Sequence, residues 1–383
     1  MKSRKHTMGA DRQARPRTVE GRILHLSSAH PWTDNRIHLR EASALAKAGM
    51  DVGLVAVDND LSAVETGVRV VRTAPRGRLG RMTLGAVSAL RAAVRSRAQV
   101  VHLHDPELIW TVPVLQALGR TVVYDAHEDL PSQVMHKPYI HPVVRTGLAA
   151  VSSALLRVAD RADLVVAATE TVAERFDPSH TVVVRNFPQA VPQERAIVPV
   201  SRRPLTAVYV GGLSEARGTG DLVAAAGSEA WPEGWTLSMA GPGAGFLVDG
   251  LKAERGWSRV EHHGLVAPLD ARRLVAEARV GLVVLRDTPN HRLALPTKMF
   301  EYMAAGTPVI ASDFPLWRSI LERYDCGILV DAGDPEQIAS AVRRYAEDPE
   351  FLERHSANAL HAYRTEVNWE AESRVLVAAY EAL

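Results

Sequence analysis

Residues 295–315, LPTKMFEYMAAGTPVIASDFP, place a cation and a carboxylate at the start of an expected helix. A helix that begins near Pro296, with Thr297 as its cap, directs free N–H groups and a positive dipole end at a ligand. Lys298 lies beside those groups, and this arrangement favours an anion such as a phosphate. Glu301, one turn further on, could accept two hydrogen bonds from a vicinal diol such as a ribose. The alternative is that Glu301 is a surface carboxylate favoured by the helix dipole.

The same segment predicts where its helix ends. Met299, Phe300 and Met303 share one helical face, which we expect to be buried. Gly306 predicts a left-handed stop, and Pro308 prevents the helix from continuing. Residues 309–311 are apolar and predict a short strand that follows.

This segment resembles the donor-binding segment of family-four retaining glycosyltransferases of the GT-B fold. The resemblance extends from about Arg22 to the end of the chain. That family often carries two glutamates separated by seven residues, and Glu301 matches the second, which holds the ribose of the sugar nucleotide. Leu293 occupies the position of the first. Because Leu293 replaces the first glutamate, the resemblance does not extend to a glutamate that contacts the donor sugar. It still includes the nucleotide site.

Two further segments match the donor side of that family. Gly211 and Gly212 follow an expected strand and leave room for a ligand, and Arg217 stands where relatives carry a basic residue on the donor diphosphate. Arginine binds phosphate through two parallel hydrogen bonds. His127, just after another expected strand, matches the histidine that relatives place against the donor hexose. A structural role is the alternative for His127.

The loop after the first expected strand, SSAHPWTDNRI, lacks the glycine pair found in many relatives. It resembles a subgroup with an Asp-x-Arg-Ile turn, and we therefore include Asn35 and Arg36 among the candidate acceptor or cleft residues. Helix capping by Asp34 or Asn35 is the alternative.

His102 and His104 alternate along one expected strand and so share a face, with Asp105 adjacent. They could form a metal site, but no further ligand lies at a characteristic spacing. We therefore favour strand-end packing and cleft lining for both histidines. Asp105 and Glu107 are expected to shape the acceptor pocket.

Composition narrows the class of protein. The chain has 383 residues, 46% hydrophobic and 23% charged, and a net charge of +1, which describes a globular protein without the basic face that nucleic acid requires. A single cysteine, Cys326, excludes an internal disulfide and fits a reducing compartment, so we expect a cytoplasmic enzyme. Charged residues interrupt the apolar region 138–168, which argues against a membrane span. A weak membrane-surface contact through the basic N-terminus stays open.

Alternating strand-like and helix-like runs predict an α/β protein with two Rossmann-like, doubly wound parallel-sheet domains facing across a cleft. Strands are expected in the first half at 23–27, 52–57, 68–71, 100–104, 122–124, 164–167 and 182–184, and in the second at 206–210, 236–239, 259–262, 280–285, 309–311 and 328–330. Prolines at 188, 192, 199 and 204 indicate a linker between the halves. The expected divisions are a disordered basic N-terminus (1–20), an acceptor-binding domain (21–190), a linker (191–204), a nucleotide-sugar-binding domain (205–365) and a C-terminal helix crossing back to the first domain (366–383).

These features predict a retaining glycosyltransferase that moves a sugar from a nucleotide diphosphate sugar, with UDP favoured, to an acceptor hydroxyl. Retention is implied by the resemblance alone. The acceptor could be a carbohydrate, a lipid-linked sugar or a small molecule, in polysaccharide or specialised-metabolite biosynthesis. In this scheme Arg217 and Lys298 stabilise the leaving diphosphate, so no metal or other cofactor is needed, and a leaving-group oxygen takes the acceptor proton. The alternatives are a non-catalytic sugar-nucleotide-binding partner and a sugar-nucleotide epimerase.

Overall fold

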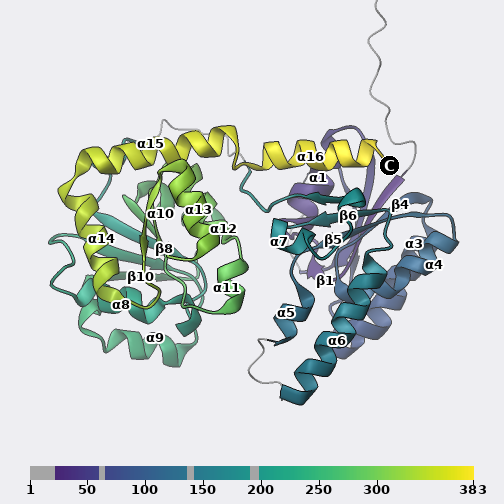
Figure 1. Cartoon of the computed structure of the whole chain (residues 1–383), viewed down its shortest axis with the longest axis horizontal. Helices are drawn as coiled ribbons and strands as arrows, with labels where there is room; N and C mark the ends of the chain where they lie inside the picture. The colour runs from purple at the N-terminus through teal and green to yellow at the C-terminus, as the bar shows by residue number, and fades with distance from the viewer. Residues whose placement is uncertain (1–21, 60–64, 136–141, 190–197) are drawn as a thin grey trace, which may run out of the picture. The chain divides into compact units, whose positions relative to one another are not determined.

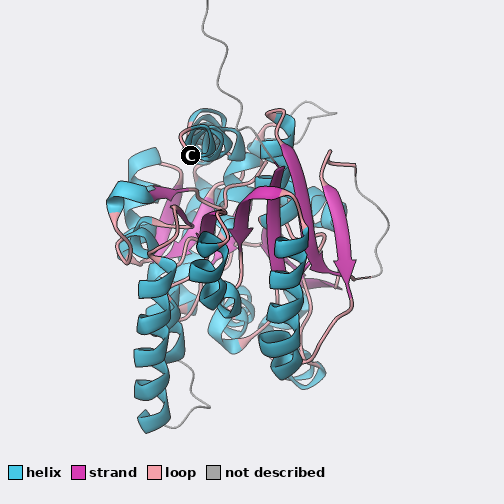
Figure 2. Ribbon diagram, turned by 90° about the vertical axis from the view of Figure 1, so that its right-hand side faces the viewer, coloured by secondary structure: helices cyan, strands magenta, loops and turns pink. Residues whose placement is uncertain are grey.

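The computed structural model describes residues 22–59, 65–135, 142–189 and 198–383 (Figure 1). The expected basic N-terminus (1–20) and residues 191–197 of the expected linker lie outside these ranges. The described chain forms two parallel sheets with helices between the strands (Figure 2). The predicted fold class is therefore confirmed at the level of its two parallel-sheet α/β halves.

The first sheet has seven strands in the order β3-β2-β1-β4-β5-β6-β7. β1 pairs in parallel with both β2 and β4. The strands up to β3 are therefore added on one side of β1 and the strands from β4 onward on the other, and the switch point of the sheet lies between β1 and β4. Its strands are β1 (Arg22–Pro31), β2 (Asp51–Val57), β3 (Arg69–Thr73), β4 (Ala98–Leu103), β5 (Thr121–Ala126), β6 (Leu164–Ala167) and β7 (Thr181–Val183).

The second sheet has six strands, all paired in parallel, in the order β10-β9-β8-β11-β12-β13. Here the corresponding change of direction lies between β8 and β11. Its strands are β8 (Thr206–Val210), β9 (Thr236–Ala240), β10 (Val260–Gly264), β11 (Val280–Val283), β12 (Val309–Ser312) and β13 (Gly327–Val330). Every residue of β11 and β12 is buried, as expected for parallel strands covered on both faces.

Helices and short helical turns connect the strands. In the first half they are η1 (Ile37–Ala42), α1 (Ser43–Lys47), α2 (Arg78–Gly80), η2 (Arg81–Gly85), α3 (Ala86–Arg95), η3 (Pro106–Thr111), α4 (Val112–Ala117), α5 (Leu130–Met135), α6 (Pro142–Ala159), α7 (Glu170–Ala173) and η4 (Pro178–His180). In the second half they are η5 (Val200–Arg202), η6 (Glu215–Arg217), α8 (Thr219–Gly227), α9 (Gly245–Lys252), η7 (Arg255–Arg259), α10 (Pro268–Glu277), α11 (Pro289–Leu293), α12 (Thr297–Ala304), α13 (Pro315–Tyr324), α14 (Pro335–Glu347), α15 (Pro349–Thr365) and α16 (Trp369–Glu381).

Strand β1 differs from its prediction because it does not end at Ser27. Leu26 lies opposite Val55 and Leu103, and after an irregular stretch Pro31 lies opposite Val57. Residues 27–30 therefore form a bulge inside the strand instead of an open loop. A bulge of this kind redirects side chains at the end of a strand.

By compactness the chain divides into two units. One takes in the described residues up to Asp125 together with Arg161–Val165 and Leu376–Leu383, and the other takes in Ala126–Asp160 and Val166–Val375. The last turns of α16 thus belong to the first unit, where the Tyr380 hydroxyl lies 2.7 Å from His102 Nδ1. Among the helices of the described ranges, none has the length and apolar character needed to cross a membrane.

Candidate active site

The charged groups of Lys298 and Arg217 lie close to two glycines that follow β8. A Cβ atom on Gly211 would lie 2.8 Å from Lys298 Nζ, and one on Gly212 would lie 3.0 Å from Arg217 Nη1. Side chains at either glycine would therefore displace the cations. We call Gly211, Gly212, Arg217 and Lys298 the glycine–cation cradle. The structure brings together these four residues, all predicted from the sequence to contact the donor.

The Lys298 ammonium is buried without a hydrogen-bond partner among the described residues. It lies 4.1 Å from the centre of the Tyr209 ring, which offers a weakly attractive aromatic face. Burial, and then the nearby Arg217 charge, lower the pKa of Lys298 to about 7 against the opposing effect of Glu301. A buried cation without a partner is unfavourable, so an anion that entered here would gain both a charge and an unsatisfied donor.

Lys298 comes from helix α12, which lies in the chain between β11 and β12, whereas the two glycines follow β8, the neighbour of β11 in the sheet. Its cap position is Pro296, and no side chain caps it, so the predicted capping by Thr297 is wrong. Pro296 takes the extended conformation (φ −72°, ψ 116°), which makes Thr297 the first helical residue. The first N–H groups of α12 are therefore not occupied by a capping side chain.

The remainder of the 295–315 segment follows its prediction. Met299, Phe300 and Met303 are buried, and Gly306 has the expected left-handed conformation, with φ of +62°. Glu301 is exposed, which leaves its carboxylate accessible to a ligand. Leu293, in the place of the missing glutamate, ends helix α11 and is 44% exposed.

Buried contacts fix the strand end that carries the glycines. The Tyr302 hydroxyl accepts a hydrogen bond of 3.1 Å from the Val210 N–H, which anchors the last residue of β8 to helix α12. Arg286 makes two hydrogen bonds of 2.6 Å to Asp221 in α8. Because Arg286 already has this bidentate carboxylate partner, it differs from Lys298 and Arg217 of the cradle.

The corresponding position in the first sheet is built differently. The carboxylate of Asp105, which follows β4, accepts hydrogen bonds from Ser28 N–H at 2.5 Å, Ala29 N–H at 3.2 Å and the Ser27 hydroxyl at 2.9 Å. Two N–H groups of the bulge, those of Ser28 and Ala29, are thus occupied by an anion of the protein itself. An external phosphate would have to compete with Asp105 for them.

The second oxygen of Asp105 contacts His30. Oδ1 lies 2.8 Å from His30 Nδ1, and the two side chains are 1% and 35% exposed respectively. Burial alone would raise the pKa of Asp105, but hydrogen bonds from His30, Ser28 and Ser27 outweigh it and hold the pKa at about 2. The same hydrogen bond to Asp105 raises the pKa of His30.

Glu107 extends this polar group. It accepts a hydrogen bond of 3.1 Å from the Ser28 hydroxyl, and Arg81 Nε lies 2.6 Å from its Oε1. Asp105 and Glu107, both predicted to shape an acceptor pocket, therefore lie beside the same bulge. Their role towards an acceptor stays a prediction.

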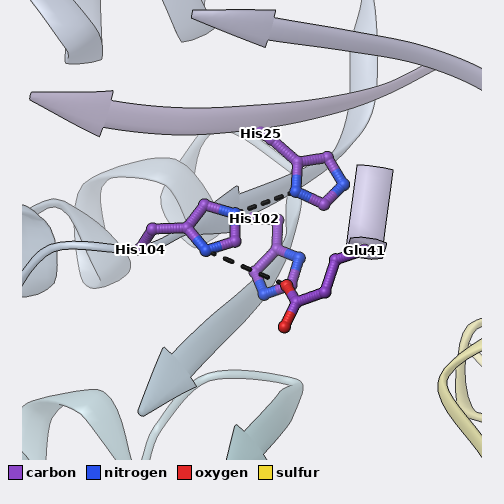
Figure 3. A group of neighbouring side chains, drawn as sticks. All are labelled: His25, Glu41, His102 and His104. Carbon is purple, nitrogen blue, oxygen red and sulfur yellow. Dashed lines mark hydrogen bonds and ion pairs between the residues drawn. The ribbon is translucent and has the colours of Figure 1, made fainter. Parts of the chain in front are cut away.

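A buried polar cluster lies beneath this bulge. Figure 3 shows three histidines, His25, His102 and His104, facing one another with Glu41 beside them. His25 Nδ1 and His104 Nε2 are 2.8 Å apart, and His104 Nδ1 lies 2.9 Å from Asp125. Burial, and then the neighbouring His104, lower the pKa values of His25 and His102 well below the ordinary range, so both rings are neutral.

Arg36 completes the cluster. It is 5% exposed, and Nη2 lies 2.7 Å from Asp125 while Nε lies 3.0 Å from Glu41. Asp34 accepts hydrogen bonds from the N–H groups of Arg36 and Ile37 at 2.8 and 2.9 Å, which closes the turn before η1, whose own cap residue is Arg36. Arg36 thus faces the interior and Asn35 is exposed, and their predicted acceptor contacts stay predictions.

The histidine cluster has the residue types of a metal site, and its geometry can be tested for one. His25, Glu41, His102 and His104 lie close enough to share an ion. However, His104 uses Nδ1 towards Asp125 and Nε2 towards His25, whereas a metal ligand needs one nitrogen with a lone pair directed at the ion. His104 fits a hydrogen-bonded network better than a metal site, in keeping with the packing role favoured from the sequence.

His127 directly follows β5, as predicted, and is half-buried. The strand before it belongs to the first sheet, whereas the glycine–cation cradle follows a strand of the second. Sequence reasoning missed His30, His25 and Asp125. One feature could have indicated His30, namely its position after the serines of the first loop. Its partner Asp105 follows a different strand, so the pair could not be seen in the sequence.

Two family models match adjoining parts of the chain. The model described as glycosyltransferase family 4 matches residues 36–204, and the model described as glycosyl transferases group 1 matches residues 204–348. A glycogen synthase of Mycobacterium tuberculosis is 25% identical over 302 residues, which are 74% of this chain and 69% of that protein. The lipopolysaccharide core biosynthesis mannosyltransferase LpcC of Rhizobium leguminosarum is 26% identical over 58% of this chain and 65% of its own.

Solved structures share the whole architecture. HepE of Anabaena in complex with UDP matches with a TM-score of 0.71 and 16% identity, over 94% of this chain and 100% of that chain. Sucrose-phosphate synthase from Thermosynechococcus elongatus matches with a TM-score of 0.72 and 21% identity, over 94% and 98%. These likenesses establish the fold as the GT-B type expected from the sequence.

Proposed function

Because the chain belongs to the glycosyltransferases of family 4 and group 1, we propose that its donor is a nucleotide diphosphate sugar whose diphosphate occupies the glycine–cation cradle. The sugar passes from this donor to a hydroxyl group of an acceptor. UDP is the favoured nucleotide, and HepE of Anabaena, which shares the fold, contains UDP in its crystal structure.

The buried, unpartnered ammonium of Lys298 is the observation that carries this proposal. The side chain of Arg217 lies next to it, and the uncapped start of α12 adds N–H groups and a positive dipole end. A diphosphate carries negative charge on two neighbouring groups and so matches two cations held side by side. These groups stabilise the charge that grows on the diphosphate as the sugar leaves.

Family resemblance supplies the remaining roles. Glu301 anchors the ribose, His127 orients the hexose, and the configuration at the anomeric carbon is retained. The acceptor is a carbohydrate, a lipid-linked sugar or a small molecule. Leu293, in place of a glutamate, favours one alternative, a protein that binds the sugar nucleotide without catalysing transfer.

Calorimetry with UDP, GDP and ADP tests the proposal. The wild-type protein should bind UDP or GDP, and Lys298→Met, which keeps the length of the side chain and removes its charge, should weaken that binding by about 10-fold to 150-fold or more. The matched control is Lys252→Met, because Lys252 is an exposed lysine of the same half that pairs with Asp249. Equal affinities in Lys298→Met and the wild type would exclude the cradle as the diphosphate site.

Turnover is then measured as nucleotide release from UDP-glucose and GDP-mannose, with water alone or with a mixture of monosaccharides as acceptor. Release that depends on the wild-type cradle supports the transferase. Tight UDP binding without release from any donor of the panel would favour the non-catalytic alternative.

A further inference from the structure

We propose that Arg286 is a positioning residue of the donor site, because it binds the carboxylate of Asp221 and so prevents that carboxylate from drawing Arg217 away from the glycine–cation cradle. The inference rests on the proposed function, since Arg217 is one of the two cations assigned to the diphosphate. All three residues belong to the second compact unit.

The turn that carries Arg217 is anchored on both sides of that residue. The carbonyl of Ala216, just before it, accepts a hydrogen bond of 3.0 Å from the Arg286 N–H. Gly218, just after it, is left-handed (φ +67°), and a Cβ atom there would lie 2.0 Å from the carbonyl oxygen of Val284. The main chain of the turn is therefore packed directly against the segment that follows β11. Rotation of the Arg217 side chain then decides where its guanidinium lies.

The carboxylate of Asp221 lies beside the same turn. Its Oδ2 atom is 3.4 Å from the position that a Cβ atom would take on Gly218, the residue after Arg217. Asp221 belongs to the first turn of α8, and its side chain is 7% exposed. A buried carboxylate without a partner is unfavourable and attracts a cation that can reach it. The long side chain of Arg217 can turn towards this carboxylate as well as towards the cradle.

Arg286 engages both oxygens of Asp221. Its Nε donates to Oδ2 and its Nη2 donates to Oδ1, both at 2.6 Å, which is the bidentate geometry of a strong arginine–carboxylate pair. The Arg286 carbonyl oxygen lies 2.8 Å from His291 Nδ1. A Cβ atom on Gly333 would lie 3.6 Å from the Arg286 Cδ, Nε and Cζ atoms, so the turn after β13 packs against the same side chain. Arg286 is thus held in place to neutralise Asp221.

Arg217 differs from Arg286 in its partners. Within the described parts of the chain it forms no ion pair with a carboxylate, and its Nη1 makes a long hydrogen bond of 3.5 Å to the Gly212 carbonyl oxygen. Its side chain is exposed. The guanidinium therefore keeps its donors available for a diphosphate, and the bidentate pair of Arg286 and Asp221 accounts for this availability.

Three other interpretations make different predictions. If the ion pair only stabilises the fold, UDP affinity does not depend on either residue. If the ion pair acts by clamping α8, replacing Arg286 and replacing Asp221 weaken UDP binding equally. If Arg286 contacts the donor itself, its replacement weakens UDP binding whether or not the Asp221 carboxylate is present.

Three variants separate these cases. Arg286→Met keeps the length of the side chain and leaves Asp221 unpaired, Asp221→Asn removes the carboxylate charge, and the third variant combines both changes. Arg354→Met is the matched control, because Arg354 also pairs with an aspartate, with Nε 3.2 Å from Asp325 Oδ2. Asp325 precedes β13, whereas the cradle glycines follow β8, so the control pair lies at the opposite end of the sheet.

We expect Arg286→Met to weaken UDP binding in calorimetry by about 10-fold or more, as loss of a hydrogen bond to a charged ligand does. Asp221→Asn and the double variant should bind UDP within about threefold of the wild type, because neither has a carboxylate that draws Arg217 away. The control should match the wild type. In an Arg217→Ala background, Arg286→Met should change UDP affinity by less than about twofold, because its effect passes through Arg217. GDP replaces UDP throughout if the wild type binds it more tightly.

Stability is recorded in the same samples. Arg286→Met should have a lower melting temperature than the wild type, because it leaves a buried carboxylate unpaired, and the double variant should recover part of the loss. Binding is therefore measured well below the melting temperature of each variant. If Arg286→Met does not fold, Arg286→Gln, which can donate a hydrogen bond to Asp221 without bringing a charge, takes its place in every comparison.

Unchanged UDP affinity in Arg286→Met would assign the ion pair to stability alone. Equal losses in Arg286→Met and Asp221→Asn would show a clamp, and a loss in the double variant as large as in Arg286→Met would show that Arg286 contacts the donor. Each of these results overturns the inference, as does an effect of Arg286→Met that persists in the Arg217→Ala background. Failure of the wild type to bind UDP or GDP would overturn the proposed function, and this inference with it, before any variant is compared.

Discussion

The two sheets solve the same structural problem in opposite ways at the same topological position. In each, the first strand (β1 or β8) lies beside the fourth (β4 or β11), and the segment that leaves the first strand reaches the switch point. In the first sheet that segment is closed by the carboxylate of Asp105. In the second it is the Gly211-Gly212 pair, which contacts two cations and, among the described residues, has no carboxylate bound to it in this way.

The difference separates buried charges that have a partner in the protein from a buried charge that has none in the described parts of the chain. Asp125, Arg36 and His104 form a network in which each charge has a buried partner, and such a network holds geometry. Lys298 is buried with no hydrogen-bond partner in the described parts of the chain. The desolvated ammonium is unfavourable by itself, so an anionic ligand that paired with it would remove this unfavourable free energy. In the proposed function the first sheet therefore orients groups, and the second attracts an anion.

Breaking the satisfied network should have the largest effect. Asp125→Asn leaves the buried Arg36 without its main counter-charge, and we expect the free energy of unfolding to fall by about 3–5 kcal/mol. Urea denaturation at neutral pH measures this change.

Glu41→Gln is the matched control for this variant. Burial raises the pKa of Glu41 well above its ordinary value, against the opposing charge of Arg36, so we expect the neutral glutamine to be tolerated better there than at Asp125. Its unfolding free energy should change by less than about 1 kcal/mol, the size of one neutral hydrogen bond. Equal losses in the two variants would show that both carboxylates neutralise Arg36.

Breaking the unsatisfied site should separate binding from stability. Lys298→Met removes hydrogen bonds to a charged ligand, each worth about 1.5–3 kcal/mol, so UDP affinity should fall about 10-fold to 150-fold or more. The free protein should become more stable at neutral pH, because a buried cation is replaced by an apolar chain. A variant that lost both affinity and stability would mean that Lys298 has a structural partner.

The pH dependence of stability sharpens the same point. The pKa of Lys298 is about 7 in the folded protein and about 10.4 in an unfolded chain. Between these values the unfolded state holds a proton that the folded state lacks, so this group makes the protein more stable as pH rises. The advantage of Lys298→Met over the wild type should therefore shrink from pH 7 to pH 10, in chemical denaturation series on both proteins. A constant difference would place the folded pKa of Lys298 near its ordinary value.

Sequence reasoning succeeded where the determinants of structure are local. The helix start near Pro296, the buried face of Met299, Phe300 and Met303, and the stop at Gly306 depend on neighbours within a few residues. Thr297 was misplaced by one position because Pro296 itself adopts the cap conformation. Alternation of apolar runs likewise located the strands, although their ends shifted by a few residues.

Pairs that depend on strand order could not be predicted. His30 meets Asp105 only because β1 lies beside β4, and no periodicity in the chain reveals that order. Arg36 was named from the turn around it, and the sequence did not reveal its buried partner Asp125, which comes from β5. Long-range partners of charged residues are therefore the part of this site that the structure adds.

The smallest expected effect is that of metal removal. Charge on the leaving diphosphate is neutralised either by a bound cation or by fixed protein cations. In the second sheet Arg217 and Lys298 already supply two such charges, and they would repel a divalent ion. Two groups among the described residues have the spacing to hold a metal. One is His25, Glu41, His102 and His104, and the other is His104, Asp125 and His127. Their members come from β1, η1, β4 and β5 or directly follow these elements.

We therefore expect EDTA to leave UDP affinity and nucleotide release unchanged, measured by calorimetry and by turnover of the preferred nucleotide sugar. The melting temperature should be recorded in the same samples, because it responds to the other group of residues. If an ion occupied the histidine cluster, EDTA would lower the melting temperature while UDP affinity stayed constant, because a metal that binds only the folded state stabilises it. Loss of activity with recovery on adding Mg²⁺ or Mn²⁺ would instead show that the two protein cations are insufficient, and the contrast between the two sheets would no longer explain the diphosphate site.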